Sequence, residues 1–320
     1  MIRIAFWGLG SIAKRHIRNL YGILVEKNLK FEIDIIRHSN KIIEDLWLKD
    51  LICNVYIEQE IKLISSKKEI IYDVIFVTNP TSLHYNAIKA GAAIARNMFI
   101  EKPVFDCYNV NVSDLMLRKS GIYYVACPLR YTSVIQYIKK NIDIRDVYSA
   151  RAISSSYLPD WRPQEDYRIT YSAHKNMGGG VAIDLIHEWD YLTYLFGKPE
   201  QVFYVGGKFS GLEIDSDDLA VYIGKYSDKL VELHLDYFGK KTIRGLVLFT
   251  RKDTIMADII NGKITYLSGR KEIDLKEERD CYQKRELEHF WDMVDGKCNN
   301  DNNIENALDV LKIAKGFNDL

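Results

Sequence analysis

The sequence lacks long apolar runs, and it has no excess charge of either sign. No segment approaches the roughly 18 apolar residues that a membrane-spanning helix requires, and Met1-Ile2-Arg3 precedes a strand rather than the apolar region of a signal peptide. Lys plus Arg and Asp plus Glu both total 44, so no net field attracts nucleic acid or an anionic membrane. These absences predict a cytoplasmic protein that acts on small molecules, with no nucleic-acid or membrane partner.

The cysteines form no pattern that a metal site or a disulfide framework requires. Their number is odd, they are widely scattered, and neither a CxxC pair nor a histidine at metal-ligand spacing occurs. We therefore expect reduced, structural thiols and no metal. The five residues are Cys53, Cys107, Cys127, Cys281 and Cys298. Repeats and low-complexity segments are absent too, and 320 residues suffice for two domains.

The first 127 residues predict a doubly wound α/β domain, because apolar strand-like runs alternate with helical patterns. The expected strands are 2–7, 31–36, 55–57, 71–78, 98–101 and 122–127, and helical spacing follows residue 11 and recurs over 82–90. Ile12, His16, Leu20 and Ile23 form the first helical pattern. Strands that are apolar nearly throughout indicate a parallel sheet covered on both faces.

Residues 128–320 form the second expected domain, in which strands follow one another mostly without intervening helices. These strands are 147–156, 202–209, 219–223, 230–237, 243–249, 254–259 and 264–267. Turns between them, such as Asn261-Gly262, predict a large, mostly antiparallel open sheet. Helices are expected over 132–140 and 181–190, on the inner face of this sheet, and over 282–294 and 304–317. The final helix is a candidate to pack back on the first domain.

A glycine-rich turn lies where the first expected strand meets the first helix. Gly8-x-Gly10-x-x-Ala13 fits the dinucleotide fingerprint, in which the first glycine permits the turn and the second lets the backbone approach pyrophosphate. The small third residue allows close helix packing, and Ser11 and Ile12 complete the turn. This position predicts a nucleotide-binding site, although the same hexapeptide also occurs in structural turns.

The end of the second expected strand indicates which cofactor is bound. An acid normally holds the adenosine ribose hydroxyls there, whereas this chain has Arg37, followed by His38, Ser39 and, after Asn40, Lys41. Cations and hydroxyl donors suit a 2′-phosphate, so we expect NADP, with NAD as the alternative. The other explanation is that these side chains only face solvent.

A glycine triplet, Gly178-Gly179-Gly180, precedes the helix expected over 181–190. On that helix Asp184, His187 and Asp190 are spaced by three and would project from one face. Two carboxylates around an imidazole suit proton transfer. The structural alternative is an early-turn acid at Asp184, a solvated Asp190 and a core histidine at His187.

These segments together resemble the Gfo/Idh/MocA oxidoreductases over almost the whole chain. The matching segments are Gly8-Leu9-Gly10, Thr78-Asn79-Pro80-Thr81 with His84, Glu101-Lys102-Pro103, Pro128-Leu129-Arg130-Tyr131, and the glycine triplet with Asp184, His187 and Asp190. The resemblance implies an N-terminal Rossmann domain and a C-terminal α/β domain whose open sheet mediates a homodimer or homotetramer. It also implies cofactor contacts from Thr78, Asn79, Pro80, His84, Glu101, Lys102 and Arg130.

The resemblance further implies that Lys102 lies at the nicotinamide end of the cofactor and helps to move the proton of the substrate hydroxyl. A lysine partly desolvated beside a cofactor can have a lowered pKa and act as acid or base near neutral pH. Family members usually place the histidine four residues after the aspartate, but Asp184 and His187 are three apart, which is similar to a branch associated with surface-sugar biosynthesis. We expect His187 to act with Lys102, and Asp184 or Asp190 to orient the imidazole or bind sugar hydroxyls.

Residues 157–168, just before the glycine triplet, are rich in aromatic side chains and arginine. Aromatic faces stack on sugar rings and arginine forks bind carboxylate or phosphate, so we expect substrate contacts from Tyr157, Trp161, Arg162 and Arg168. The alternative is a packing loop in which Trp161 is simply buried. Arg130 either contacts substrate or cofactor or caps the following helix.

The leading hypothesis is an NAD(P)-dependent dehydrogenase or reductase that moves hydride between nicotinamide C4 and a secondary carbinol. The expected substrate is a sugar, nucleotide sugar or cyclitol. One alternative is hydrolysis or elimination through transient oxidation, with the cofactor recycled. The other is a catalytically silent protein that senses NAD(P).

Overall fold

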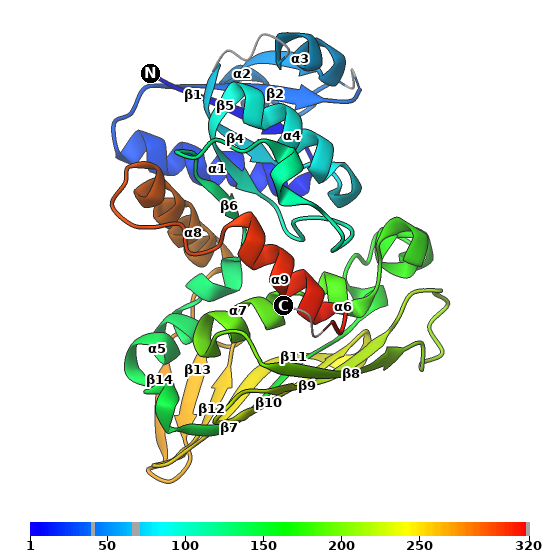
Figure 1. Cartoon of the computed structure of the whole chain (residues 1–320), viewed down its shortest axis with the longest axis vertical. Coiled ribbons are helices and arrows are strands. Elements are labelled where there is room, and N and C mark those ends of the chain that lie inside the picture. The colour runs from blue at the N-terminus through cyan, green and yellow to red at the C-terminus, as the bar shows by residue number, and fades with distance from the viewer. Residues whose placement is uncertain (40–41, 66–70, 318–320) are drawn as a thin grey trace. The chain divides into compact units, whose positions relative to one another are not determined.

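The structure, a computed structural model, describes residues 1–39, 42–65 and 71–317, and it divides into two compact units (Figure 1). The first unit contains Met1–Ala126 and Gln283–Leu308. The second contains Cys127–Tyr282 and the chain from Asp309 onward. No helix among the described residues is long and apolar enough to cross a membrane.

The first unit is built on a six-stranded, fully parallel sheet in the order β3-β2-β1-β4-β5-β6. Its strands are β1 Ile2–Trp7, β2 Phe31–Arg37, β3 Ile52–Ile57, β4 Tyr72–Val77, β5 Ala95–Ile100 and β6 Tyr123–Val125. Strand order reverses between β1 and β4, which is the switch point where doubly wound folds bind ligands. The predicted Rossmann sheet is therefore confirmed.

Helices α1 Ser11–Glu26, α2 Leu46–Leu51, α3 Glu58–Ser65 and α4 His84–Ile94 lie between these strands. Helix α1 buries an apolar stripe that includes Ala13, Ile17 and Leu20. Helices α2 and α3 were not expected from the sequence, because each is short and polar residues interrupt its pattern. Two further helices, α8 Arg279–Val294 and α9 Ile304–Ala314, lie near the C-terminal end of the described chain.

The second unit contains an eight-stranded sheet in the order β14-β13-β12-β11-β7-β10-β9-β8. Its strands are β7 Val147–Tyr157, β8 Gln201–Gly207, β9 Leu219–Lys225, β10 Leu230–Asp236, β11 Phe238–Thr250, β12 Thr254–Asp258, β13 Lys263–Tyr266 and β14 Lys271–Asp274. Only β7 and β10 pair in parallel, so the expected mostly antiparallel sheet is confirmed. Strand β14 was missed because it is a polar edge strand with one apolar residue in four.

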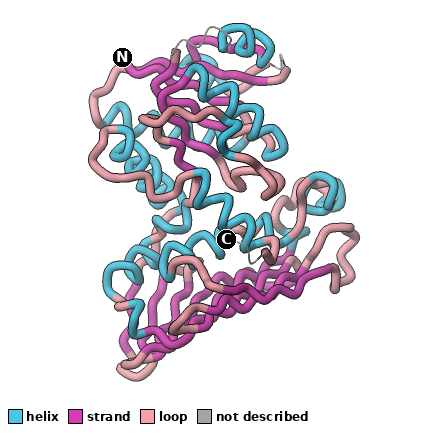
Figure 2. The backbone as a smooth tube through the Cα atoms, in the orientation of Figure 1, coloured by secondary structure: helices cyan, strands magenta, loops and turns pink. Residues whose placement is uncertain are grey.

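One face of this sheet is covered by helices, among them α5 Ser133–Asn141 and α7 His187–Phe196 (Figure 1). Trp189 of α7 packs edge-on against Tyr222 of β9, with ring centroids 5.5 Å apart. A side chain at Gly224 would meet this indole at 3.0 Å, so the glycine admits the close packing. The opposite face carries no helix from the part of the chain that the structure describes (Figure 2).

The continuous helix predicted over 181–190 is wrong. The structure has two helices, α6 Val181–Asp184 and α7, separated by Leu185 and Ile186. All six residues from 181 to 186 are buried, and the chain leaves helical geometry at Leu185, where φ is −98° and ψ is 25°. Asp184 and His187 therefore belong to different helices, and the argument that placed them on one helical face fails.

Candidate functional site

Gly8 makes a turn that only glycine adopts easily, with φ at +102°. A Cβ at this position would lie 2.8 Å from the backbone nitrogen of Asn79 and 2.9 Å from its Cα. The hydroxyl of Thr78 lies 3.2 Å from the carbonyl oxygen of Trp7 and 3.1 Å from that of Gly8, and it can donate to either. The loops after β1 and β4 are thus in direct backbone contact.

Gly10 precedes α1 and leaves room for a ligand. Among the described residues, no atom beyond Gly10 and its two chain neighbours lies within 4 Å of the position where its Cβ would be, and none of their side chains caps the helix. The first N–H groups of a helix lack intrahelical partners and favour negative charge, which is the arrangement that receives a pyrophosphate. Ser11 is exposed there, Ile12 is half-buried, and Ala13 is fully buried beneath the turn.

The side-chain amide of Asn79 is a second feature, after the open position at Gly10, that suits a bound ligand. Both polar atoms of its side-chain amide are buried and have no hydrogen-bond partner among the described residues. Buried amides are normally satisfied, so this donor and acceptor beside the glycine turn fit contacts to a bound cofactor. The following Pro80 is exposed, and it begins the link to α4. A nicotinamide dinucleotide fits this set of residues.

His84 ties the Asn79 loop to the segment that follows Lys102. Its Nε2 lies 3.0 Å from the carbonyl oxygen of Asn79, and its Nδ1 lies 3.2 Å from that of Val104. Burial lowers the pKa of His84, although the nearby carbonyls and the charge of Glu101 act in the opposite direction. A neutral imidazole donates to one of the two carbonyls, and the ring connects two loops at the same edge of the sheet.

Glu101 directly follows β5 and precedes Lys102, and both oxygens of its carboxylate have partners. Oε1 lies 2.5 Å from Nε2 of His16, and Oε2 accepts the backbone N–H of Lys102 at 3.2 Å. Burial raises the pKa of Glu101, but the hydrogen bond with His16 and the charge of Lys102 outweigh it, so the pKa is lowered. His16 was not identified as a site residue from the sequence. The sequence feature that could have pointed to it is a histidine at a position of the buried stripe of α1.

Arg37 ends β2 as expected, and its Nε is buried without a hydrogen-bond partner among the described residues. His38 and Ser39 follow it at the surface, and Lys41 lies outside the described residues. Glu58, at the start of α3, was not predicted as a site residue but lies near His38 and Trp7. Its Oε1 accepts the indole N–H of Trp7 at 2.9 Å, and its Oε2 lies 3.6 Å from Nδ1 of His38.

In the second unit Asp184 lies within an aromatic cluster. Its Oδ2 accepts the hydroxyl of Tyr237 at 2.5 Å. Trp161 packs edge-on against Tyr237 with centroids 5.3 Å apart, and its indole N–H donates to Ser156 at 2.9 Å. Burial, and then the charge of Asp184, raise the pKa of Tyr171. The two tyrosines were not predicted as site residues.

Trp161 is neither fully buried nor free of the core. It keeps 36% of its surface exposed while its ring packs on Tyr237. The side chain therefore packs on the core and also presents part of its surface to solvent. A partly exposed ring with a fixed indole N–H can still stack on a ligand.

The charged residues of the 157–168 loop bind mainly to one another. Arg168 pairs with Asp166 and Glu213, each at 2.8 Å. Arg162 lies 3.6 Å from Glu165 and over the ring of Tyr171. The ring of Tyr157 carries the ammonium of Lys240 at 3.3 Å from its centroid.

Arg130 and Asp190 form a buried bidentate pair. Nε of Arg130 donates to Oδ2 at 2.9 Å and a terminal nitrogen donates to Oδ1 at 2.7 Å. The guanidinium also lies over the ring of Tyr194. Helix α5 is capped by Thr132 instead, whose hydroxyl accepts the N–H of Ile135. Of the two expected partners of His187, Asp190 is thus engaged with Arg130.

Lys102 belongs to the first unit, whereas Asp184 and His187 belong to the second. His187 is the first residue of α7 and is half-buried. The meeting of the lysine and the imidazole across one crevice stays a prediction.

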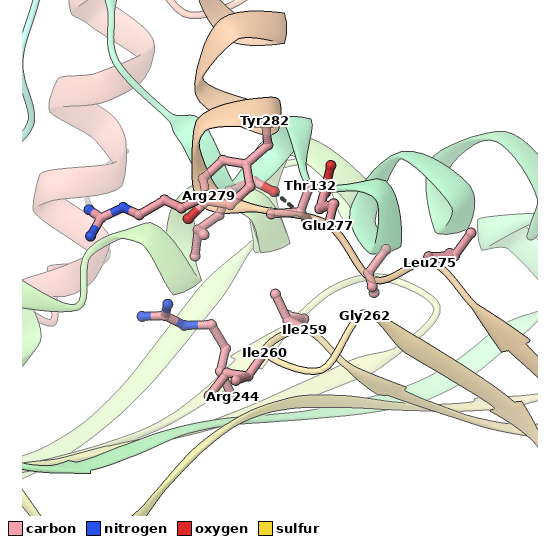
Figure 3. Close-up of a pocket in the computed structure, with 11 residues that line it drawn as sticks. Thr132, Arg244, Ile259, Ile260, Gly262, Leu275, Glu277, Arg279 and Tyr282 are labelled. Carbon is pink, nitrogen blue, oxygen red and sulfur yellow. Dashed lines mark hydrogen bonds between the residues drawn. The ribbon is translucent and has the colours of Figure 1, made fainter. Parts of the chain in front are cut away.

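A cavity of about 250 Å³ lies within the second unit, and no predicted site residue lines it (Figure 3). It is bounded by the start of α5, the β12–β13 turn and the residues that lead into α8. Its arginine from β11, Arg244, donates to the buried Glu188 at 2.8 Å, and Glu277 accepts the backbone N–H of Ser133 at 2.6 Å. Arg244 and Glu277 are therefore both engaged in structural contacts.

No family model matches the chain. A 2,7-anhydro-N-acetylneuraminate hydratase of Escherichia coli (strain K12) is 26% identical over 181 residues, which cover 53% of this chain and 46% of the relative. An uncharacterized oxidoreductase, YrbE, of Bacillus subtilis (strain 168) is 26% identical over 138 residues, which cover 42% and 38%. These matches span less than half of either relative.

Solved structures match almost the whole chain. A levoglucosan dehydrogenase, solved with NADH and levoglucosan, has a TM-score of 0.80 at 13% identity and covers 99% of this chain and 96% of its own. An oxidoreductase from Thermotoga maritima has 0.78 at 19%, covering 98% and 95%. The WlbA dehydrogenase from Bordetella pertussis, in complex with NADH and UDP-GlcNAcA, has 0.76 at 15%, covering 99% and 95%. The chain has the fold of the Gfo/Idh/MocA oxidoreductases. The resemblance seen in the sequence motifs is confirmed.

Replacing Arg130 by alanine should destabilise the protein by about 3–5 kcal/mol, because it leaves the buried carboxylate of Asp190 without its partner. Chemical denaturation followed by circular dichroism measures the change. Arg168→Ala is the matched control, since the pairs of Arg168 are exposed and should contribute little. Equal losses in the two variants would contradict the structural role of the Arg130–Asp190 pair.

Proposed function

We propose that the chain is an NAD(P)-dependent oxidoreductase that transfers hydride between nicotinamide and a secondary alcohol or ketone of a sugar, nucleotide sugar or cyclitol. The observation that carries this proposal is the glycine turn of the first unit. Its open position at Gly10, uncapped helix and unsatisfied Asn79 amide together suit a dinucleotide. The fold supports the same conclusion, since similar structures bind NADH with levoglucosan or UDP-GlcNAcA.

In this proposal a bound nicotinamide supplies the hydride acceptor or donor. Lys102 and His187 are the catalytic acid/base groups: in the oxidation direction one accepts the hydroxyl proton as the C–H hydride leaves, and in reduction the proton returns. Asp184 binds a sugar hydroxyl, because its carboxylate already accepts the hydroxyl of Tyr237 within an aromatic cluster. Trp161 offers its exposed edge to the sugar ring.

The cofactor preference that we propose is for NADP. The buried, unpartnered Nε of Arg37 supports it, because a 2′-phosphate would supply the missing acceptor. Glu58 is the feature that opposes it, since its carboxylate lies at the same edge and could accept from ribose hydroxyls instead. The preference depends on whether Arg37 binds a 2′-phosphate more strongly than Glu58 binds the ribose hydroxyls.

A second candidate function is hydration or elimination through transient oxidation, in which the cofactor is recycled. It is favoured by the sequence match to a hydratase that acts on an anhydro sugar acid. Net accumulation of reduced cofactor during turnover separates the two functions, since only the dehydrogenase accumulates it. Neither outcome applies to a silent NAD(P) sensor, which would bind cofactor without turnover.

We also propose that two or four copies associate through the uncovered face of the eight-stranded sheet. Phe203 and Ile223 are cross-strand partners on that face, and they keep 52% and 42% of their surfaces exposed. The next pair, Val205 and Val221, keeps 69% and 36%. Contiguous exposed apolar surface marks interaction sites. An Arg151–Glu232 pair beside this surface has both charges available to a symmetry mate.

Lys102→Ala and His187→Ala should each lower kcat by about two to four powers of ten if these groups carry the proton. A panel of sugars, nucleotide sugars and cyclitols with NADP and NAD, followed by absorbance of the reduced cofactor, provides the assay. Lys252→Ala, a change at an exposed lysine, is the control. Near-normal turnover in both active-site variants would refute the assignment.

Arg37→Gln should lower the preference for NADPH over NADH by at least about tenfold, because the variant loses the cation that faces a 2′-phosphate. Quenching of tryptophan fluorescence gives both dissociation constants without any substrate. Lys27→Gln, at the exposed C-terminal end of α1, serves as control. A wild-type preference for NADH would instead assign the adenosine ribose to Glu58.

Introducing lysine at both Phe203 and Ile223 should convert the oligomer to a monomer, because like charges then face each other across the interface. Light scattering after size exclusion measures the mass. Met116→Lys, an exposed apolar site in the first unit, should leave the mass unchanged. A monomeric wild type, or a variant that keeps the wild-type mass, would contradict the proposed interface.

A further inference from the structure

His16 is a buried ionisable residue that the proposed chemistry does not use. It lies on α1 with 1% of its surface exposed, and its ring packs against Phe99 and Phe76 at centroid distances of 5.0 and 6.1 Å. Burying a polar ring among aromatic residues is unfavourable unless it forms a hydrogen bond. The bond that it forms is to Glu101, at 2.5 Å.

The partner of His16 is adjacent to the proposed acid/base lysine. The carboxylate of Glu101 binds His16 through Oε1 and the backbone N–H of Lys102 through Oε2. The backbone N–H of Glu101 in turn donates to Val77 of β4. The carboxylate and backbone N–H of Glu101 thus together connect α1, β4 and the lysine segment, all within the first unit.

The protonation of this pair follows from its surroundings. Nδ1 of His16 is buried and has no hydrogen-bond partner among the described residues, so that nitrogen is better left unprotonated than as an unsatisfied N–H. The neutral tautomer then donates from Nε2 to Glu101 and leaves the carboxylate with its negative charge. The titratable groups that act on Glu101 are His16 from α1, Lys102 beside it and His84 from α4.

We propose that His16 is a positioning residue, which keeps Glu101 ionised and so fixes both the backbone of Lys102 and the negative charge beside its amine. This inference rests on the proposed function only in giving Lys102 a catalytic role. A negative charge next to an ammonium group favours the protonated form. Loss of the His16 donor leaves Glu101 buried and poorly solvated, so the carboxyl takes up a proton and the charge is lost.

The test measures titration of Lys102 without substrate. The rate at which acetic anhydride labels Lys102 is followed against pH by mass spectrometry, and only the neutral amine reacts. In His16→Leu the midpoint should fall by about one pH unit, since one unit reflects a moderate change in local charge interactions. Glu101→Gln should give the same fall, and the double variant no more than either single one. His16→Gln keeps an N–H donor and should stay near the wild type.

Asn19→Leu is the matched control, because Asn19 is buried on the same helix and its side-chain nitrogen has no partner among the described residues. It should leave the midpoint unchanged. An unmoved midpoint in His16→Leu and Glu101→Gln, with only the unfolding temperature lowered, would reduce His16 to a structural role and overturn the proposal.

Two further results keep the inference separate from the proposed function. Nitrogen-15 NMR of the wild type should show His16 protonated at Nε2 and not at Nδ1, and the opposite tautomer would overturn the proposal even if no variant folds. Turnover that survives Lys102→Ala would refute the catalytic assignment and leave the labelling result intact. With an identified substrate, the acidic limb of the oxidation rate should move to lower pH in His16→Leu and fail to move in Asn19→Leu.

Discussion

The contact between the Gly8 turn and the Asn79 loop is the constraint on which the proposed nucleotide-binding edge depends. A side chain at position 8 would collide with backbone atoms of Asn79, so the two loops reach this separation only with glycine there. Because β1 and β4 are parallel neighbours, their C-terminal ends bring both loops to the edge where strand order reverses. His84 then links the same loop to the segment after Lys102. The absence of a side chain at Gly8 therefore allows the Gly8 turn to contact the Asn79 loop, and His84 connects that loop to the lysine segment.

In the second unit, buried charges fix the orientation of α7. Asp190 pairs with Arg130, and Glu188 pairs with Arg244 of β11. Burial raises the pKa of Glu188, although the Arg244 charge opposes the change. Breaking either pair would leave a desolvated charge, so each pair opposes rotation of the helix. His187 begins this helix, so these two ion pairs also help to fix its position.

The sequence predicted the fold better than the geometry of the site. Apolar runs located most strands of both sheets, because the alternating or continuous apolar pattern of a buried strand can be recognised from the residues of that strand alone. The break at Leu185–Ile186 could not be predicted, since six buried residues in a row are equally compatible with a buried helix. His16, Tyr237 and Glu58 were missed for another reason: each acquires its role from a partner at least 50 residues away. Such pairings depend on topology, and local patterns do not contain them.

The charge balance of the 157–168 loop bears on how a sugar would be recognised. Arg168 is bound by two acids and Arg162 lies near a third, so neither guanidinium offers an uncompensated charge. Around Asp184, by contrast, the exposed groups are the aromatic side chains of Trp161 and Tyr171, while Tyr237 is fully buried and donates its hydroxyl to Asp184. Such groups suit the apolar face and hydroxyls of a neutral sugar ring, since stacking and hydrogen bonding require no charge on the ligand. A negatively charged part of a substrate, such as a diphosphate, would have to be bound outside this cluster.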